Sequence, residues 1–196
     1  MATLRVAGTP RLRHIAPMTT ARNNIVLIGM PGAGKSTVGQ RLAQRLGLGF
    51  TDTDTLIETD QGASLQAIID HQGHQALRQI EAQLLTHLVC ERHVIATGGS
   101  AVYSANAMAA LQAHGVIVHL YVELAVIAAR VHNFDTRGIA RAAGQSMAEL
   151  YAERDALYRQ YAEISVDVSQ ANEEQATAAI EQALSAAHLL PPALAY

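Results

Sequence analysis

The chain has 196 residues, of which 49% are hydrophobic, and a formal net charge of -3 at pH 7. This length fits one domain with a hydrophobic core, and no apolar run is long enough to cross a bilayer. A slightly acidic chain without a basic stripe argues against nucleic acid as the main partner.

Residues 1–22 differ in composition from the rest of the chain. They contain four arginines and no acidic residue, and two prolines interrupt any helix. They lack the long apolar core of a secretory signal, although they share features with an organelle-targeting peptide. We expect a disordered extension here, with Met18 as an alternative start.

The first strand is expected at residues 25–28, directly before the glycine-rich segment 29–37. The segment reads GMPGAGKST and fits the phosphate-loop pattern G-x-x-x-x-G-K-[ST]. In such a loop, backbone N–H groups surround nucleotide phosphates and the next helix directs its positive end towards them. An ordinary strand-to-helix turn is the alternative interpretation. We expect nucleotide binding by Gly32, Ala33, Gly34, Lys35, Ser36 and Thr37.

Two side chains of this loop have separate expected roles. Lys35 should bridge the terminal phosphates, and Ser36 should ligate Mg²⁺. The helix that follows is expected to present Val38, Leu42 and Leu46 on its apolar face, and Gly47 is expected to end it.

The remaining chain alternates between strand and helix patterns. Strands are expected near 48–51 and at 93–97, 116–122 and 164–168; helices at 76–91, 104–114, 124–131, 146–162 and 173–188. Because the β-branched strands lack alternation, the pattern predicts an α/β fold with a parallel sheet covered on both faces. Ligands of such sheets bind beyond the carboxyl ends of the strands.

Two aspartates, Asp52 and Asp54, stand at the end of the second expected strand. Mg²⁺ prefers oxygen ligands and keeps several waters, so one carboxylate can hold the ion while the other meets a substrate hydroxyl. The alternative is a helix start, because Thr53 or Asp54 would also make a good N-cap.

The single cysteine, Cys90, lies in an apolar stretch, and we interpret it as a buried small hydrophobe in a reducing, cytoplasmic setting. Several histidines fit no zinc motif and are expected in the core or on the surface, namely His71, His74, His87 and His93. Three tyrosines at near-helical spacing are expected to pack: Tyr151, Tyr158 and Tyr161.

Five spaced motifs and one single arginine, in order, resemble those of the shikimate kinases, a family of small P-loop kinases. The matching elements are Gly29–Thr37, Phe50-x-Asp52-x-Asp54-x-x-Ile57-Glu58, Gly73-x-x-x-Leu77-Arg78-x-Ile80-Glu81, Ala96–Gly99, Arg137 and Arg154-x-x-Leu157-Tyr158. The resemblance implies a P-loop kinase fold with a five-stranded parallel sheet flanked by helices. It also implies one domain at 23–190, with a substrate-binding region at about 53–82, a lid at about 133–145 and a tail at 191–196.

The implied activity is ATP-dependent phosphorylation of the 3-hydroxyl of shikimate, with ATP and Mg²⁺ as cofactors. By this resemblance, Asp54 would orient the attacking hydroxyl and accept its proton, and Asp52 would support Mg²⁺ through water. Arg78 and Arg154 would hold the shikimate carboxylate, which a guanidinium matches in bidentate fashion. Two glycines would offer backbone N–H groups to the substrate and the γ-phosphate, namely Gly98 and Gly99.

On the nucleotide side, the resemblance implies that Arg137 closes from the lid onto the phosphates, where it would act in catalysis together with Lys35 and Asp54. Arg130 would lie against the adenine. A lid cation offsets the charge of the transferring phosphoryl group.

Each of these residues also has an ordinary structural interpretation. Arg78 and Glu81 are spaced i, i+3 and could pair on a helix surface. Arg154 lies in a charged segment typical of a solvated helix face, Arg130 could simply end its helix favourably, and residues 97–99 could form a plain turn.

The chain departs from the family pattern at three places. Ser100 stands where the family has a third glycine, Gly138 replaces the proline of the lid, and Leu77 replaces a phenylalanine. We expect a less rigid lid and an altered environment for the acceptor.

Two alternatives therefore remain beside shikimate phosphorylation. One is a related kinase for another small hydroxylated acid or polyol, and the other is a nucleotide-binding module without turnover. The intact acidic and basic groups of the motifs argue against the module. We expect a monomer whose partner is a small anionic substrate, with no nucleic acid or membrane partner.

Overall fold

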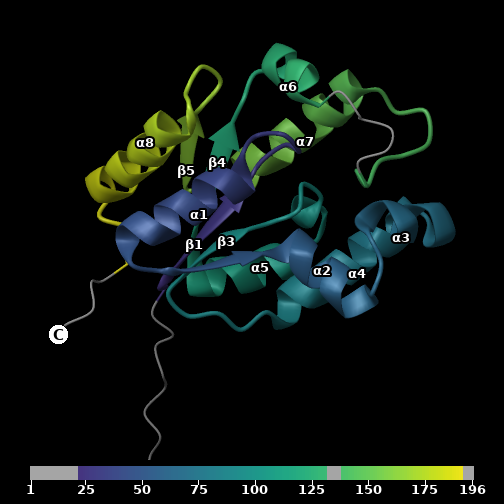
Figure 1. The fold of residues 1–196 in the computed structure, drawn as a ribbon, viewed down its shortest axis with the longest axis horizontal. Coiled ribbons are helices and arrows are strands. Elements are labelled where there is room, and N and C mark those ends of the chain that lie inside the picture. The colour runs from purple at the N-terminus through teal and green to yellow at the C-terminus, as the bar shows by residue number, and fades with distance from the viewer. Residues whose placement is uncertain (1–21, 132–137, 192–196) are drawn as a thin grey trace, which may run out of the picture.

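The computed structural model describes residues 22–131 and 138–191 (Figure 1). The lid arginine Arg137, most of the N-terminal extension and all but the first residue of the tail lie outside the described residues. The lid predicted at 133–145 is described from Gly138 onwards.

A five-stranded, fully parallel sheet forms the centre of the molecule. The strands are β1 (Asn24–Ile28), β2 (Gly49–Asp52), β3 (His93–Ala96), β4 (Gly115–Tyr121) and β5 (Ile164–Asp167). Their order across the sheet is β2-β3-β1-β4-β5, so the chain changes direction along the sheet at β1. The sheet confirms the predicted α/β fold, and its carboxyl edge beside β1 is where such sheets bind ligands.

Helices cover both faces of the sheet. They are α1 (Lys35–Leu46), α2 (Thr53–Gln61), α3 (Leu65–Gln72), α4 (His74–His87), α5 (Ala105–His114), α6 (Leu124–Arg130), α7 (Met147–Tyr161) and α8 (Glu173–Ala186), with a short 3₁₀ turn η1 (Ala101–Tyr103). In Figure 1, α1 lies beside α8 on one face, while α4 packs against α5 on the other. Within the described ranges, no helix is both long and apolar enough to cross a membrane.

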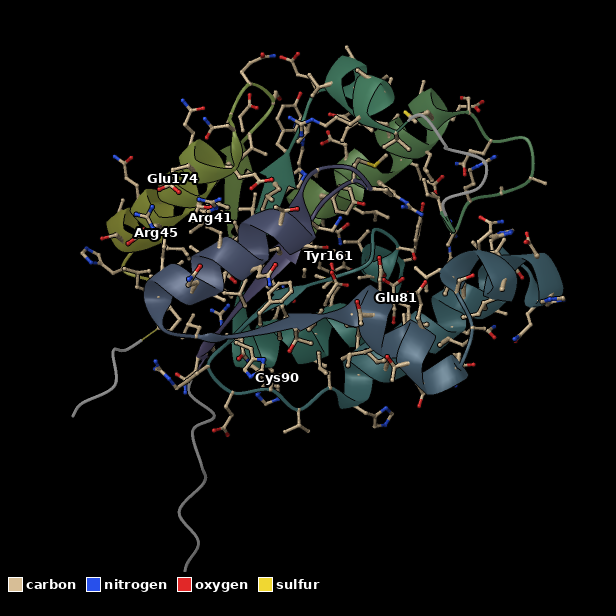
Figure 2. All side chains as sticks on the ribbon, in the orientation of Figure 1. Arg41, Arg45, Glu81, Cys90, Tyr161 and Glu174 are labelled. Atoms are coloured by element: carbon tan, nitrogen blue, oxygen red, sulfur yellow. The ribbon has the colours of Figure 1, made fainter. Side chains whose placement is uncertain are left out.

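The contact between α1 and α8 includes a set of surface ion pairs (Figure 2). Arg41 and Arg45 of α1 each place a guanidinium nitrogen 2.7 Å from a carboxylate oxygen of Glu174. Exposed pairs of this kind contribute about 0–1 kcal/mol each. The packing of the two helices therefore depends mainly on the apolar face of α1. Val38 and Leu42 of this face are buried, as expected.

Two hydrophobic cores are present. The larger core surrounds the sheet, and every residue of β1 is buried within it, because both faces of a central parallel strand are covered. The smaller core joins α2, α3 and α4 to the segment after residue 137, through Ile57, Ile68, Leu77 and Ala140. This second core underlies the region at 53–82 for which we predicted substrate binding.

The end of α4 corrects one prediction. The helix expected at 76–91 ends at His87, because Leu88 has extended backbone angles and Val89 is 90% exposed. Cys90 consequently lies in the connection to β3 and is half-buried, with Thr51 Oγ1 3.7 Å from its sulfur. The expectation of a buried cysteine is therefore met only in part, because Cys90 packs against the large core but stays partly accessible.

The N-terminal boundary also moves by one residue. Arg22, which we assigned to the disordered extension, donates from Nε to the carbonyl of Gly115 at 3.2 Å and pairs with Glu163. Glu163 in turn accepts a hydrogen bond from the N–H of Ile117. Arg22 therefore belongs to the folded domain.

Candidate active site

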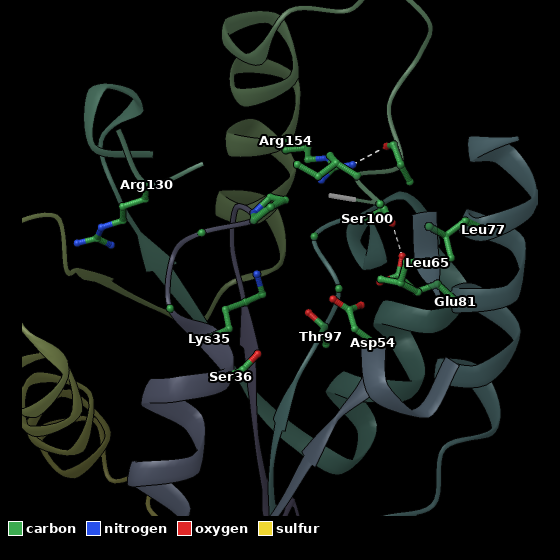
Figure 3. A pocket seen from close by; sticks show the side chains of 18 of the residues that line it. Lys35, Ser36, Asp54, Leu65, Leu77, Glu81, Thr97, Ser100, Arg130 and Arg154 are labelled. Carbon is green, nitrogen blue, oxygen red and sulfur yellow. Dashed lines mark hydrogen bonds between the residues drawn. The ribbon is translucent and has the colours of Figure 1, made fainter. Parts of the chain in front are cut away.

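A cavity of about 380 Å³ lies at the carboxyl edge of the sheet. Its wall combines the loop after β1, the start of α2, the turn after β3, the face of α4 and one side chain of α7 (Figure 3). The predicted residues that it brings together are Gly32, Gly34, Lys35, Ser36, Thr37, Asp54, Gly98, Gly99, Arg130 and Arg154.

The loop after β1 has the backbone shape of a phosphate loop. Gly29, Gly32 and Gly34 all have positive φ angles, of 146°, 85° and 91°. Gly34 stands in the left-handed conformation directly before α1, which only glycine adopts without strain. The open N-terminus of α1 therefore faces the cavity and favours an anion.

Lys35 folds back onto this loop. Its Nζ donates to the carbonyls of Gly29 at 2.8 Å and Met30 at 3.0 Å. Burial lowers the pKa of Lys35 to about 8, while the charge of Asp54 acts in the opposite direction. The side chain of Lys35 is therefore mostly protonated at neutral pH, and the carboxylate of Asp54 stabilises its positive charge.

Asp52 is the N-cap of α2. Its Oδ1 accepts from the N–H of Asp54 at 3.0 Å and from that of Thr55 at 3.5 Å. The alternative interpretation placed the helix start at Thr53 or Asp54, whereas the cap in the structure is Asp52. The cap holds the first turn of α2 so that the carboxylate of Asp54 lines the cavity.

The turn after β3 allows acidic groups to approach closely. A Cβ at Gly98 would collide with Glu81 Oε1 and lie 2.6 Å from Asp54 Oδ1. The N–H of Gly98 donates to Thr53 Oγ1 at 3.1 Å, so this donor already has a protein partner. A Cβ at Gly99 would lie 2.8 Å from Arg154 Nη1. The two glycines thus provide space for three functional side chains.

Glu81 is the site residue that sequence reasoning missed. It belongs to a family motif, but the only contact we expected for it was a surface pair with Arg78; its side chain is 2% exposed and lines the cavity. The hydroxyl of Ser100 donates to its Oε2, whereas Oε1 has no hydrogen-bond partner in the described part of the chain. Burial raises the pKa of Glu81 to about 7. Its spacing could have revealed it, because Leu77, Glu81 and Leu85 share one buried helix face.

Arg154 is 1% exposed and forms part of the cavity wall. Its Nη2 donates to the carbonyl of Ala140 at 2.6 Å, and its Nε to Tyr103 Oη at 3.4 Å. Within the described ranges, no carboxylate lies close enough to form an ion pair with it. A buried cation without an ionic partner favours an anionic ligand, and the alternative of a solvated helix face is wrong.

Arg78 lies next to the cavity rather than in its wall. Its Nη2 donates to Ala140 O at 3.1 Å, so the two predicted acceptor arginines share one carbonyl. Its guanidinium borders an adjoining hollow of about 340 Å³. The surface ion pair with Glu81 is not formed, because Glu81 bonds to Ser100 instead.

Arg130 lies between this cavity and a second hollow of about 590 Å³, and it borders both. It ends α6, as the structural alternative proposed, and its Nη2 donates to the carbonyl of Ser169 at 3.4 Å. The second hollow runs from the phosphate loop to the first turn of α8. A nucleotide base and ribose could enter it from the phosphate loop.

The described part of the lid is anchored by contacts with its neighbours. Gly138 donates its N–H to Gln66 Oε1 at 2.7 Å and has a φ of 70°. Ala140 is 3% exposed and belongs to the smaller core. Residues 138–140 therefore pack against α3 and α4, and the expectation of a less rigid lid stays a prediction.

The cavity joins a phosphate loop, a buried lysine, a carboxylate and a buried arginine at one edge of a parallel sheet. These features define the class of P-loop phosphotransferases, kinases that move a phosphoryl group to a small acceptor. The family model described as shikimate kinase matches residues 31–185. The chain belongs to the shikimate kinase family.

Individual relatives agree with this assignment. The shikimate kinase of Aromatoleum aromaticum is 36% identical over 167 residues, which cover 84% of this chain and 95% of the relative. The shikimate kinase of Halorhodospira halophila is 38% identical over 150 residues, which cover 75% of this chain and 85% of the relative. These matches confirm the resemblance inferred from the spaced motifs.

Solved structures confirm the P-loop kinase fold. A shikimate kinase from Acinetobacter baumannii in complex with shikimate has a TM-score of 0.79 and 31% identity, and the match covers 87% of this chain and 97% of that one. The enzyme from Aquifex aeolicus has a TM-score of 0.73 and 27% identity, with 85% and 98% covered.

Proposed function

We propose that this protein transfers the γ-phosphoryl group of ATP to the 3-hydroxyl of shikimate. One observation carries the proposal: Arg154, buried without a carboxylate partner among the described residues, shares a cavity with Lys35 and Asp54. An acceptor with a carboxylate at one end and a hydroxyl at the other could place the carboxylate at Arg154 and the hydroxyl at Asp54. The names of the relatives and the shikimate bound to the Acinetobacter enzyme support the same acceptor.

The nucleotide side follows from the phosphate loop. Backbone N–H groups of residues 32–37 and the ammonium of Lys35 would bind the phosphates, and Arg130 would lie against the adenine. Mg²⁺ fits the oxygen donors present: the hydroxyl of Ser36 would hold it, and Asp52 would reach it through water. When bound, the ion offsets charge on the β- and γ-phosphates.

The acceptor side would work through Asp54 and the two arginines. Asp54 would orient the attacking hydroxyl and accept its proton as the bond to phosphorus forms. Arg154 and Arg78 would hold the acceptor carboxylate. Of the two glycines, Gly99 would offer its N–H, whereas Gly98 would mainly provide space for Asp54 and Glu81.

Arg137 would close onto the phosphates from the lid and stabilise the transferring group. We further propose that the protein acts as a monomer in the cytoplasm, with small molecules as its only substrates. The free thiol of Cys90 fits a reducing compartment.

A related kinase for another small hydroxylated acid is the second candidate, and Ser100 is the observation behind it. Its hydroxyl lines the cavity where the family has a glycine. However, this hydroxyl already donates to Glu81 inside the wall. That bond makes Ser100 a weaker candidate for direct acceptor recognition and favours shikimate.

A coupled assay of ADP formation tests these alternatives. Purified protein is given ATP and Mg²⁺ with shikimate, quinate or gluconate, and Lys35→Ala serves as the inactive control. We expect shikimate to be the best acceptor. No transfer to shikimate at millimolar concentration, with transfer to another acid, would favour the second candidate, and nucleotide binding without any transfer would favour the non-catalytic module.

A further inference from the structure

Two cations of the proposed acceptor site converge on one carbonyl group. Arg78 and Arg154 both donate through Nη2 to the single carbonyl of Ala140, at 3.1 Å and 2.6 Å. Among residues 22–131 and 138–191, no ion pair joins either guanidinium to a carboxylate. Like charges at such separation repel, more strongly where water is excluded. Contacts beyond the shared Ala140 carbonyl therefore help to keep the two arginines together, and the charge of Glu153 also attracts both.

Tyr103 lies against both of them. The guanidinium carbon of Arg78 is 3.7 Å from the centroid of the tyrosine ring, and that of Arg154 is 5.4 Å from it. A cation within about 6 Å of an aromatic face is attracted by the ring quadrupole. One ring thus attracts two cations that would otherwise separate.

The hydroxyl of Tyr103 adds a second, directional contact. It accepts a hydrogen bond from Arg154 Nε at 3.4 Å. It also interacts with Glu153, where a hydrogen bond from Tyr103 lowers the pKa of the carboxyl group. Through this hydroxyl, Arg154 keeps an orientation that leaves Nη1 beside Gly99 at the cavity wall.

The turn that carries Tyr103 is itself held in place. Tyr103 ends η1, which directly follows the glycine turn and Ser100. Tyr158 donates its hydroxyl to the carbonyl of Gly99 at 2.7 Å and fixes the start of this turn. The position of the ring is therefore coupled to the same turn that borders Asp54 and Glu81.

We propose that Tyr103 is the positioning residue of the acceptor site, whose ring and hydroxyl hold Arg78 and Arg154 in convergence on one acceptor carboxylate. This inference rests on the proposed function, because it assigns the carboxylate to the acceptor. Tyr103 borders the adjoining hollow and not the main cavity, so it acts through the arginines rather than on the substrate.

Kinetics of two variants test the proposal. Tyr103→Leu removes ring and hydroxyl, and Tyr103→Phe removes the hydroxyl alone. We expect Tyr103→Leu to raise the KM for shikimate about tenfold with the KM for ATP unchanged, and Tyr103→Phe to recover most of this loss. The matched control is Tyr161→Leu, since Tyr161 packs against the large core at the end of the same helix as Arg154.

Chemical labelling of arginine provides a readout that does not depend on the acceptor. Phenylglyoxal modification of Arg78, mapped by mass spectrometry against exposed Arg41, should be several-fold faster in Tyr103→Leu than in the natural protein or in Tyr103→Phe. If the natural protein fails to phosphorylate shikimate, the proposed function is wrong, but this labelling still tests the role of Tyr103. The inference would be overturned by equal labelling of Arg78 in all variants. It would also be overturned if Tyr103→Leu raised the KM for ATP as much as the KM for shikimate.

Discussion

The hydroxyl of Ser100 donates a hydrogen bond to the buried carboxylate of Glu81, from a position where the family has a glycine. The bond connects the turn after β3 with α4. It also directs Oε1 of Glu81 towards Gly98, next to Asp54. Ser100 therefore acts on the acceptor site mainly through Glu81.

Replacing Ser100 tests this interpretation. Ser100→Gly removes a donor to a buried carboxyl group, and we expect a loss of about 1–3 kcal/mol in the free energy of unfolding. The kcat/KM for shikimate should change less than about threefold, because the hydroxyl does not contact the acceptor. Urea denaturation and steady-state kinetics measure the two effects. A loss of tenfold or more in kcat/KM at unchanged stability would instead make Ser100 a direct ligand.

Two buried titratable groups should give opposite pH dependences of stability. His119 is 2% exposed and stacks on Tyr158 with ring centroids 5.1 Å apart, and burial lowers its pKa to about 4. Between pH 4 and its usual value of 6.5, the unfolded chain binds more protons than the folded one. The contribution of His119 to stability therefore increases as pH rises through this range.

Glu81 acts in the opposite direction. Burial raises its pKa from 4.5 to about 7, so the folded protein binds more protons than the unfolded chain between these values. Its contribution to stability decreases as pH rises through this range, and each group changes the free energy of unfolding by up to about 3 kcal/mol. The two contributions largely cancel in the natural protein.

Single substitutions should separate the two contributions. Relative to the natural protein, Glu81→Gln should gain stability as pH rises from 5 to 7, and His119→Gln should lose stability over the same range. Urea denaturation at several pH values measures both slopes. Parallel pH profiles for the natural protein and both variants would contradict the assigned pKa directions.

Lys35 and Asp54 should affect different steps. Lys35→Ala removes the ammonium from the phosphate loop and should weaken nucleotide binding as well as transfer. Asp54→Asn keeps the size of the side chain but loses its charge, so ATP binding should persist while kcat falls about 10²-fold or more. Calorimetric titration of nucleotide and single-turnover kinetics distinguish the two effects. Normal turnover by Asp54→Asn would remove Asp54 from the role of general base.

Arg154→Lys should be poorly tolerated although the substitution keeps the positive charge. An ammonium cannot make the two-pronged contact of a guanidinium with a carboxylate, and a lysine would lose the contacts with Tyr103 and Ala140. We expect the KM for the acceptor to rise at least about tenfold with little change in the KM for ATP. Unchanged acceptor kinetics in Arg154→Lys would show that the carboxylate binds elsewhere.

The sequence predicted the parts of the site that depend on local pattern. Lys35 follows the buried strand β1 and Asp54 follows the half-buried edge strand β2, and the carboxyl ends of parallel strands meet at one edge of the sheet. The phosphate loop and the paired aspartates could therefore be placed without coordinates. Arg154 was identified only through the resemblance to the family, because its local pattern indicated a solvated helix face.

Contacts between distant segments were not predictable in this way. Tyr103 contacts Arg78 and Arg154, and Ala140 accepts from both arginines, although nothing in their spacing indicates these partners. Such contacts depend on how η1, α4, α7 and the lid pack in three dimensions. Glu81 differs from these residues. Its helical spacing from Leu77 indicates a buried position, so the sequence alone could have predicted its burial.

Gly138 has a backbone conformation that proline cannot adopt. Proline, the usual family residue at position 138, requires a φ near −65°, whereas Gly138 has a φ of 70° and donates its N–H to Gln66. Gly138→Pro should therefore unfold the smaller core locally and raise the KM for the acceptor, instead of making the lid more rigid.

Gly138→Ala and Gly144→Ala form a matched pair for this prediction. Both glycines have positive φ, but a Cβ at 138 would lie 2.8 Å from Leu65 Cβ, whereas at 144 nothing lies within 4 Å. Both variants should lose about 1 kcal/mol to the left-handed backbone, and Gly138→Ala should lose a further 1–3 kcal/mol, on the order of the cost of overpacking a core. Thermal and urea denaturation compare them directly. Equal stabilities would mean that residues 138–140 do not depend on their contact with α3, and acceptor binding should then tolerate Gly138→Ala as well.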